Sequence, residues 1–231
     1  NNSSGARSVM YGKTIDHVLE QHVVLSDGSV VHFRPLAAAE VDRICQQNTL
    51  EAACYREVRR LAGVHASEID RRFPKVLRRV GGYNLDNFVD PNRPFNLAKM
   101  IVGSEGTLGV VLEAKIALVP LPNAKAVLAI QFADLLEALE ATPAILLHRP
   151  SAIEIMDGFI LDNTKQSPAL DRLRRTFIEG DPAALLCVEL YDDDPRNLPG
   201  RLDAIEHTLR ARRFGYRYFR ALDLNTQATI W

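Results

Sequence analysis

Hydrophobic and polar positions alternate near the start of the chain and then change to a helical period. Val18 to Leu25 and Ser29 to Phe33 are β-prone runs, and Asp27-Gly28 between them suits a tight primed turn. From Ala37 to about Ala66, apolar residues recur at three- and four-residue spacing. The pattern therefore predicts a β-hairpin followed by a largely helical stretch.

The rest of the first half reads as short elements joined by loops. Residues 1 to 14 are rich in Asn, Ser and Gly, which predicts a loop. A second helical stretch covers Glu68 to Val80, and Pro74 is expected to break or start a helix there. A short helix is predicted over Asn96 to Val102. It is followed by two β-prone runs, Val110 to Leu112 and Lys115 to Leu118.

Pro120-Leu121-Pro122 marks a predicted domain boundary, with one domain over residues 1–122 and another over 123–231. In the second domain, strands and helices alternate. Strands are predicted at 126–132, 152–156, 184–191 and 216–221, and helices at 134–147, 157–163, 198–213 and from about 223. This order predicts an antiparallel sheet with helices on one face, as in ferredoxin-like domains. The fold class is α+β.

Composition limits the classes of function. Of 231 residues, 47% are hydrophobic and 25% charged, which is enough for packed cores, and the net charge of -1 gives no preference for nucleic acid or anionic membranes. No apolar run approaches the roughly 20 residues needed to span a bilayer. The three cysteines include no Cys-x-x-Cys, so no iron–sulfur or zinc-ribbon site is expected in this chain, and a reducing cytoplasm fits best. The start of the chain shows neither a secretory nor a targeting segment and has no Met, so a cut N-terminus is as plausible as a mature one.

Two segments of small residues are the candidate ligand loops. They are Asn1 to Arg7, followed by Tyr11-Gly12, and Gly103 to Val111. Small side chains let backbone N–H groups approach an anionic or planar ligand closely. The second segment is neither a Walker loop, since no Lys-Ser or Lys-Thr follows it, nor a dinucleotide fingerprint, since its glycines are wrongly spaced. Structural turns explain either segment alone, so a cofactor-free binding or interaction module is the alternative function.

Together the segments resemble the FAD-linked oxidases, whose flavin domain is of the vanillyl-alcohol oxidase and p-cresol methylhydroxylase type. Four elements carry the resemblance in the family's order. They are Asn2-Ser3-Ser4-Gly5-Ala6-Arg7 with Tyr11-Gly12, a hairpin around Val24-Leu25-Ser26-Asp27-Gly28, Gly82-Tyr83-Asn84-Leu85, and Gly103-Ser104-Glu105-Gly106-Thr107-Leu108-Gly109-Val110. The resemblance covers residues 1–122 well.

The resemblance implies a fold and a cofactor site. Residues 1–122 would be the second part of an FAD-binding domain, and 123–231 part of a ferredoxin-like cap, or substrate, domain. The cofactor-binding residues it implies are Asn2, Ser3, Ser4, Gly5 and Arg7 in the first loop and Gly106, Gly109, Val110 and Val111 in the second. Arg7 either pairs with a cofactor phosphate or ties down its own loop.

The resemblance also implies a reaction. In the branch of D-lactate, glycolate and D-2-hydroxyglutarate dehydrogenases, hydride passes from the α-carbon of a D-2-hydroxy acid to flavin N5. The chain would be an internal fragment, inactive alone. The pyrophosphate loop would precede residue 1, whereas the catalytic base, the metal ligands and an arginine after a Trp like Trp231 would lie beyond residue 231. The start of the chain and Arg72-Phe73-Pro74-Lys75 look most like the long bacterial branch, which adds an iron–sulfur module.

The resemblance leaves the partners partly open. A 2-hydroxy acid is the expected small-molecule partner. The electron acceptor is undetermined, and a membrane-bound acceptor would place the enzyme at the periphery of the inner membrane. Apolar area left uncovered in a fragment would favour a homo-oligomer.

Other polar groups have simpler explanations. The six histidines show no metal-ligand spacing, and Asp192-Asp193-Asp194-Pro195 suits a turn with capping carboxylates. Glu105 is expected to pack on the cofactor with its loop rather than to act in catalysis. The basic region from Arg56 to Arg79 is interleaved with acids and predicts a solvated helical face, while docking of an acidic partner domain and, more weakly, nucleic-acid binding are alternatives.

Overall fold

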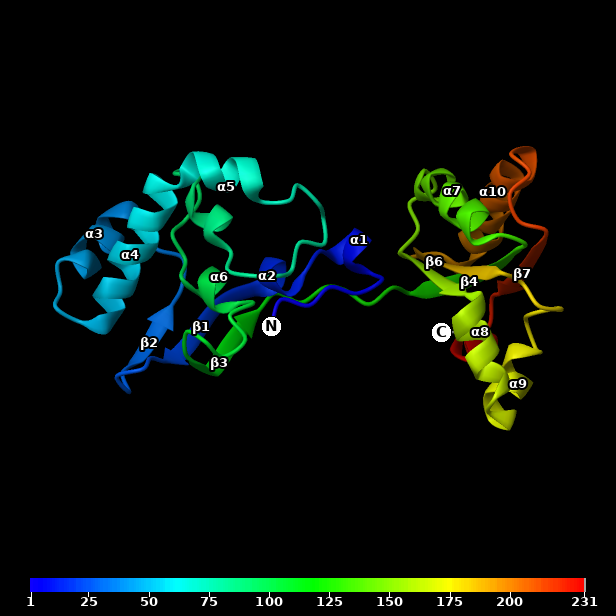
Figure 1. Cartoon of the computed structure of the whole chain (residues 1–231), viewed down its shortest axis with the longest axis horizontal. Coiled ribbons are helices and arrows are strands. Elements are labelled where there is room, and N and C mark those ends of the chain that lie inside the picture. The colour runs from blue at the N-terminus through cyan, green and yellow to red at the C-terminus, as the bar shows by residue number, and fades with distance from the viewer. Residues whose placement is uncertain (231) are drawn as a thin grey trace. The chain divides into compact units, whose positions relative to one another are not determined.

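The computed structural model describes residues 1–230 and divides into two compact units. The first unit is Asn1–Val119 and the second begins at Pro120 (Figure 1). Trp231, after which the resemblance places an arginine, lies outside the described residues. Each unit has a hydrophobic core of its own.

The first unit combines a three-stranded antiparallel sheet with short helices, in the strand order β2-β1-β3. Its strands are β1 (Val18–Val24), β2 (Val30–Phe33) and β3 (Val110–Ile116). Its helices are α1 (Ser8–Tyr11), α2 (Thr14–His17), α3 (Ala38–Cys45), α4 (Leu50–Val64), α5 (Ala66–Arg72), α6 (Ala98–Ile101) and the 3₁₀ helix η1 (Leu85–Phe88). Residues 1–14, predicted as a loop, thus contain α1 and the first residue of α2.

The hairpin of β1 and β2 is confirmed, but its turn is not the primed turn that was predicted. The Gly28 amide donates to the Leu25 carbonyl at 3.0 Å, and the Leu25 amide donates to the Ser29 carbonyl at 2.9 Å. Within the turn only Gly28 has a positive φ, +82°. The loop therefore contains three residues, Ser26, Asp27 and Gly28, and its last residue is a glycine in the left-handed region.

The helical stretch after the hairpin is interrupted where the sequence offers local stop and start signals. The hydroxyl of Thr49 accepts a hydrogen bond from the Ala52 amide at 3.1 Å and caps α4. Helix α5 ends at Arg72, and Phe73 is already extended because a residue before proline avoids the helical region. The prediction of helix up to Val80 is therefore wrong, since Pro74 ends the helix and residues 75–80 are irregular.

The core of the first unit lies between the sheet and the helices. Phe33, Tyr55 and Leu97 are buried there, with the Phe33 and Tyr55 rings 6.1 Å apart. Strand β3 joins the two predicted β-runs into one strand, which pairs with β1. All seven residues of β3 are exposed.

The second unit contains a four-stranded antiparallel sheet in the order β5-β6-β4-β7. Its strands are β4 (Ala124–Phe132), β5 (Ala152–Asp157), β6 (Ala184–Asp192) and β7 (Arg217–Ala221). Its helices are α7 (Leu135–Leu146), α8 (Gly158–Lys165), α9 (Pro168–Arg174), the 3₁₀ helix η2 (Pro195–Asn197), α10 (Leu198–Ala211) and α11 (Leu224–Ile230). Two interlocked β-α-β units produce this strand order.

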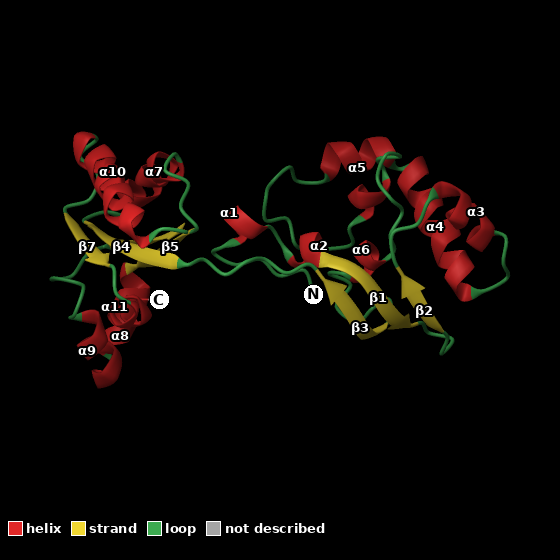
Figure 2. Ribbon diagram, turned by 180° about the vertical axis from the view of Figure 1, so that it is seen from behind, coloured by secondary structure: helices red, strands yellow, loops and turns green. Residues whose placement is uncertain are grey.

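Helices cover both faces of this sheet, so the prediction of helices on one face is wrong. Figure 2 shows α7 and α10 on one side of the strands and α8, α9 and α11 on the other. The buried residues form two clusters accordingly, one including Ile145 and Leu202, the other including Leu161 and Ile230. Because both faces are covered, seven consecutive residues of β4, Ala126 to Phe132, are buried.

None of the helices formed by residues 1–230 has the length and apolar character required to cross a lipid bilayer.

The cap of α4 provides a test of the first unit. Replacing Thr49 by alanine is expected to lower the free energy of unfolding by about 1 kcal/mol, because the Ala52 amide loses its acceptor. Thr142→Ala in α7 removes only a hydroxyl bonded within its own helix to the Ala138 carbonyl and serves as the control. Urea denaturation measures both, with hydrogen exchange of α4 amides identifying the unit that is affected. Equal losses in the two variants would contradict the capping role.

Candidate functional site

The N-terminal segment, Asn1 to Arg7, is held by hydrogen bonds to α1 and to the start of α2. The Gly5 amide donates to Ser8 Oγ at 2.9 Å, and the Ser8 amide donates back to the Gly5 carbonyl at 3.0 Å. The Thr14 amide donates to the Ser3 carbonyl at 3.1 Å. Gly5 itself faces open space, because no described atom lies within 4 Å of the position where its β-carbon would stand. The segment is thus anchored by its neighbours but leaves room above Gly5.

Asn2 is the buried anchor of this segment, with 3% of its surface exposed. Its Oδ1 accepts a hydrogen bond from the Ile15 amide at 3.0 Å. Its Nδ2 is buried and has no hydrogen-bond partner among the described residues. Leaving a buried amide donor unpaired costs about 1–3 kcal/mol, so an acceptor that reached this nitrogen would stabilise the segment.

The second loop, Gly103 to Gly109, is a tight series of turns after α6. The Thr107 amide donates to the Ser104 carbonyl at 3.0 Å, and the Thr107 hydroxyl donates to the same carbonyl at 2.6 Å. Gly103, Glu105 and Gly106 all have positive φ. Gly106, like Gly5, has no described atom within 4 Å of its β-carbon position. Glu105 adopts a conformation unusual for a non-glycine residue, with φ at 51°.

The two loops meet at Gly103. A β-carbon there would stand 3.3 Å from Asn2 Cβ, 3.5 Å from the Gly82 carbonyl oxygen and 3.6 Å from Asn84 Nδ2. Asn84, 1% exposed, donates from Nδ2 to the Val102 carbonyl at 2.6 Å. The next residue back, Tyr83, places its hydroxyl 2.8 Å from Thr107 Oγ1. Three segments far apart in the sequence, those of Asn2, Asn84 and Gly103, therefore converge at Gly103.

Gly109 was predicted to contact the cofactor, and in the structure it lies against strand β1. A β-carbon at Gly109 would stand 2.7 Å from Val23 Cγ1 and 2.8 Å from the Val24 carbonyl oxygen. This glycine is therefore required for close approach to strand β1. Val110 and Val111 follow at the start of β3 and are exposed. Contact of these three residues with a cofactor stays a prediction.

Lys99 links helix α2 to the start of strand β1. Its ammonium donates to the carbonyls of Ile15, at 2.6 Å, and Val18, at 2.7 Å, where α2 passes into β1. Burial lowers the pKa of Lys99, although Asp16 opposes the effect. Sequence reasoning overlooked both Lys99 and Asn84, although Asn84 lies inside the Gly82–Leu85 element that was singled out.

An apolar pocket adjoins the second loop. Its volume is about 430 Å³, and its lining includes Tyr83 and Leu108 together with Cys54 and Val58 of α4. Burial raises the pKa of the Cys54 thiol. A thiol with a raised pKa is a poor nucleophile at neutral pH, so this pocket shows no sign of covalent chemistry.

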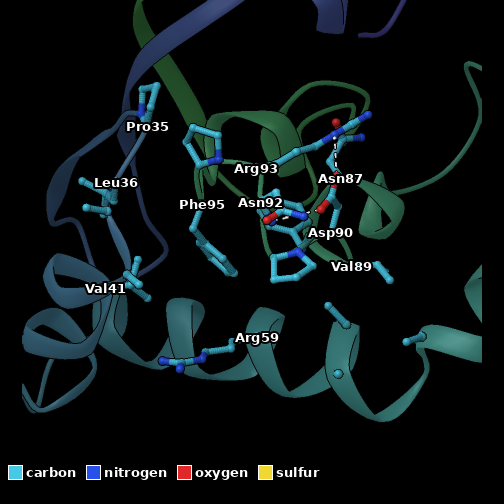
Figure 3. A pocket seen from close by; sticks show the side chains of 18 residues that line it. Pro35, Leu36, Val41, Arg59, Asn87, Val89, Asp90, Asn92, Arg93 and Phe95 are labelled. Carbon is cyan, nitrogen blue, oxygen red and sulfur yellow. Dashed lines mark hydrogen bonds and ion pairs between the residues drawn. The ribbon is translucent and has the colours of Figure 1, made fainter.

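A second hollow, of about 720 Å³, lies away from both loops (Figure 3). It is bounded by Leu36 and Val41, by Arg59 of α4 and by the loop that carries Asp90 and Arg93. The charges here are already paired, Arg59 with Asp42 at 2.5 Å and Arg93 with Asp90 at 3.5 Å. None of the predicted cofactor residues lines this hollow.

Two of the histidines that the sequence singled out contact carboxylates within the chain. The rings of His22 and His32 lie 4.2 Å apart, and each contacts a glutamate, Glu113 and Glu20 respectively. Within residues 1–230, no group of three or more His, Cys, Asp or Glu side chains is arranged to hold a metal ion. Arg7 is the residue before α1, and its carbonyl accepts from the Met10 and Tyr11 amides at 3.0 Å.

Comparison with known proteins identifies the family. No family model matches the chain. The chain is 31% identical over 210 residues to a D-2-hydroxyglutarate dehydrogenase of Pseudomonas putida, a match that covers 89% of this chain and 21% of the relative. It also resembles a solved alkyldihydroxyacetonephosphate synthase, with a TM-score of 0.56 at 15% identity over 95% of this chain and 31% of that one. The chain belongs to the FAD-linked oxidase family.

A further relative of the chain is the glycolate oxidase subunit GlcD of Bacillus subtilis. It is 27% identical over 158 residues, which cover 68% of this chain and 23% of GlcD. The family prediction made from the four sequence elements is confirmed. The chain spans about a fifth of the length of the curated relatives it matches.

Proposed function

We propose that residues 1–231 are part of a longer FAD-dependent enzyme that oxidises a D-2-hydroxy acid. Residues 1–122 would contribute to the FAD-binding domain and residues 123–231 to the cap domain. The names of the relatives support the reaction class, since they include D-2-hydroxyglutarate and D-lactate dehydrogenases. Two observations carry the proposal: the two loops meet where Asn2 contacts Gly103, and the Nδ2 of Asn2 is buried without a partner.

The residues present fit a dinucleotide cofactor. The Asn2 amide is a buried donor that lacks an acceptor, and polar atoms of a flavin or a diphosphate are acceptors of the required kind. The glycines at 5 and 106 leave open space where a side chain would otherwise stand. Small residues with open space beside a buried donor form a surface that a large planar or anionic group can approach closely.

Each part of the site has a distinct task in this proposal. Asn2 would donate a hydrogen bond to the cofactor, and the backbone of Ser3 to Gly5 and of Gly106 would lie against it. Asn84 would hold the start of the second loop through its bond to the Val102 carbonyl, and Lys99 would hold Ile15, whose amide donates to Asn2. When bound, FAD supplies a hydride acceptor, flavin N5, for the hydrogen on the α-carbon of the substrate.

The visible spectrum of the complete polypeptide that contains residues 1–231 tests the proposal. Flavin absorption is expected, and under anaerobic conditions it should bleach with a D-2-hydroxy acid and not with the L-enantiomer. The panel is D- and L-2-hydroxyglutarate, D- and L-lactate, and glycolate. A flavoprotein that bleaches with none of them would refute the reaction class. A colourless protein that cannot be reconstituted with FAD would favour a cofactor-free binding module.

A further inference from the structure

Tyr83 combines an exposed ring with a fixed position. It is 44% exposed, and its hydroxyl lies 2.8 Å from Thr107 Oγ1. The single hydroxyl proton of Thr107 is donated to a backbone carbonyl, so the Tyr83 hydroxyl is the donor in its contact with Thr107. The chain neighbours of Tyr83 are held at Gly103, whose β-carbon position is 3.5 Å from the Gly82 carbonyl oxygen and 3.6 Å from Asn84 Nδ2. A ring fixed in this way can receive a ligand with little further loss of side-chain freedom.

The Tyr83 ring lies where the second loop borders the apolar pocket. Thr107, to which Tyr83 is bonded, follows Gly106, and no described atom lies within 4 Å of the Gly106 β-carbon position. Tyr83 also lines the pocket of about 430 Å³, together with Leu108 of the same loop. The second loop therefore borders both the open space at Gly106 and the pocket.

The lining of this pocket indicates which chemistry it can bind. Its volume lies within the range of about 300–1,000 Å³ that is usual for small-molecule sites. Most of the lining is aliphatic, and among the described residues that form it Glu57 is the one with a charge. An anionic diphosphate or hydroxy acid would find no cationic partner there. An aromatic ring with few hydrogen-bonding groups fits, because it can pack against the aliphatic side chains and against the Tyr83 ring.

We propose that the pocket receives an aromatic ring of the bound cofactor and that this ring packs against Tyr83. The inference rests on the proposed function, because FAD is the cofactor of that site. FAD carries two ring systems, isoalloxazine and adenine, on either side of its diphosphate, and both have the required chemistry. A ring in the pocket would leave the polar centre of the cofactor beside the second loop, where Gly106 faces open space.

Substitution of Tyr83 in the complete polypeptide tests the packing. Tyr83→Leu is expected to raise Kd for FAD about threefold to tenfold, because an aromatic pair contributes beyond the area that it buries. Tyr83→Phe retains the ring and loses only the bond to Thr107, so its Kd should rise less. Phe159→Leu removes a ring that is 75% exposed in the second unit and serves as the matched control, with Kd unchanged. A Kd for Tyr83→Leu equal to that of the parent protein would overturn the inference.

The fluorescence of bound FAD distinguishes the two rings. Tyrosine in contact with isoalloxazine quenches flavin fluorescence by donating an electron to the excited ring, whereas leucine and phenylalanine do not. If isoalloxazine occupies the pocket, fluorescence of bound FAD should rise in both Tyr83→Leu and Tyr83→Phe. If adenine occupies it, the fluorescence should stay the same, and Tyr83→Leu should raise Kd for ADP about threefold to tenfold. Either result supports the inference, and a response of neither quantity contradicts it.

Alkylation of Cys54 separates the inference from the proposed function and uses the parent protein. The Cys54 thiol lines the pocket, whereas Cys45, also half-buried, lies outside its lining and is the internal control. FAD well above its Kd should slow the reaction of Cys54 with N-ethylmaleimide about tenfold or more and leave Cys45 unaffected, as measured by peptide mass spectrometry. Protection in a protein that oxidises no 2-hydroxy acid would support the inference and refute the proposed function. Bleaching by a D-2-hydroxy acid without protection of Cys54 would overturn the inference and leave the proposed function standing.

Discussion

Gly109→Val is expected to lower the free energy of unfolding of the first unit by roughly 3 kcal/mol, the upper part of the range for overpacking. The β-carbon alone would lie 2.7 Å from Val23 Cγ1 and 2.8 Å from the Val24 carbonyl oxygen. Val24 belongs to β1 and pairs with Val110 of β3, so its backbone cannot withdraw without breaking the strand pair. Urea denaturation gives the loss, and hydrogen exchange of β1 amides assigns it to the first unit.

A second glycine of the same loop is the control for Gly109. Gly106→Ala meets no described atom within 4 Å, but it places alanine at a φ of +82°. That conformation costs roughly 1 kcal/mol, so Gly106→Ala should be clearly milder than Gly109→Val. Equal effects would show that loop conformation, and not packing on β1, sets the requirement for glycine. If Gly109→Val loses flavin, the cause would be disruption of the pairing between β1 and β3 and not the loss of a direct contact with the cofactor.

Local signals in the sequence account for most of the elements that were predicted correctly. Asp134 was placed near the cap of a helix, and its side chain accepts from the Leu136 amide at the start of α7. The hairpin of β1 and β2 follows from Asp27-Gly28 between two β-prone runs. Helix α9 was overlooked, although Ser167 before Pro168 is a start signal, because the helix that follows has only seven residues.

Features that depend on distant residues could not be predicted from local patterns. Packing against strands from elsewhere in the chain decides which face of the second sheet a helix covers. The spacing of apolar residues within α8 or α11 does not indicate that face. The neighbour of Gly109 lies 86 positions earlier, at Val23, and the Ala6 contact of Arg78 joins residues 72 positions apart. The family resemblance predicted two loops as cofactor-binding, but only the structure shows which glycine faces open space and which faces a strand.

Gly5→Leu is expected to weaken FAD binding by the complete polypeptide roughly tenfold to hundredfold while leaving the fold intact. Gly5 does not have a positive φ, and no described atom lies within 4 Å of its β-carbon position. Its amide bond to Ser8 Oγ does not depend on the side chain and should persist. A β-carbon at position 5 meets no described atom, so under the proposed function the leucine is expected to extend into the space of the cofactor. The FAD-to-protein absorbance ratio and the Kd for FAD measure the effect.

Gly200→Leu is the matched control for Gly5→Leu. Gly200 lies in α10 of the second unit and also has no described atom within 4 Å of its β-carbon position, so the same bulk is added away from the loops. Both variants should unfold within about 0.5 kcal/mol of the parent protein, as surface substitutions usually do. Only Gly5→Leu should lose FAD. Full FAD occupancy in Gly5→Leu would place the cofactor elsewhere, and a loss of stability without a loss of FAD would make Gly5 a structural residue of its loop.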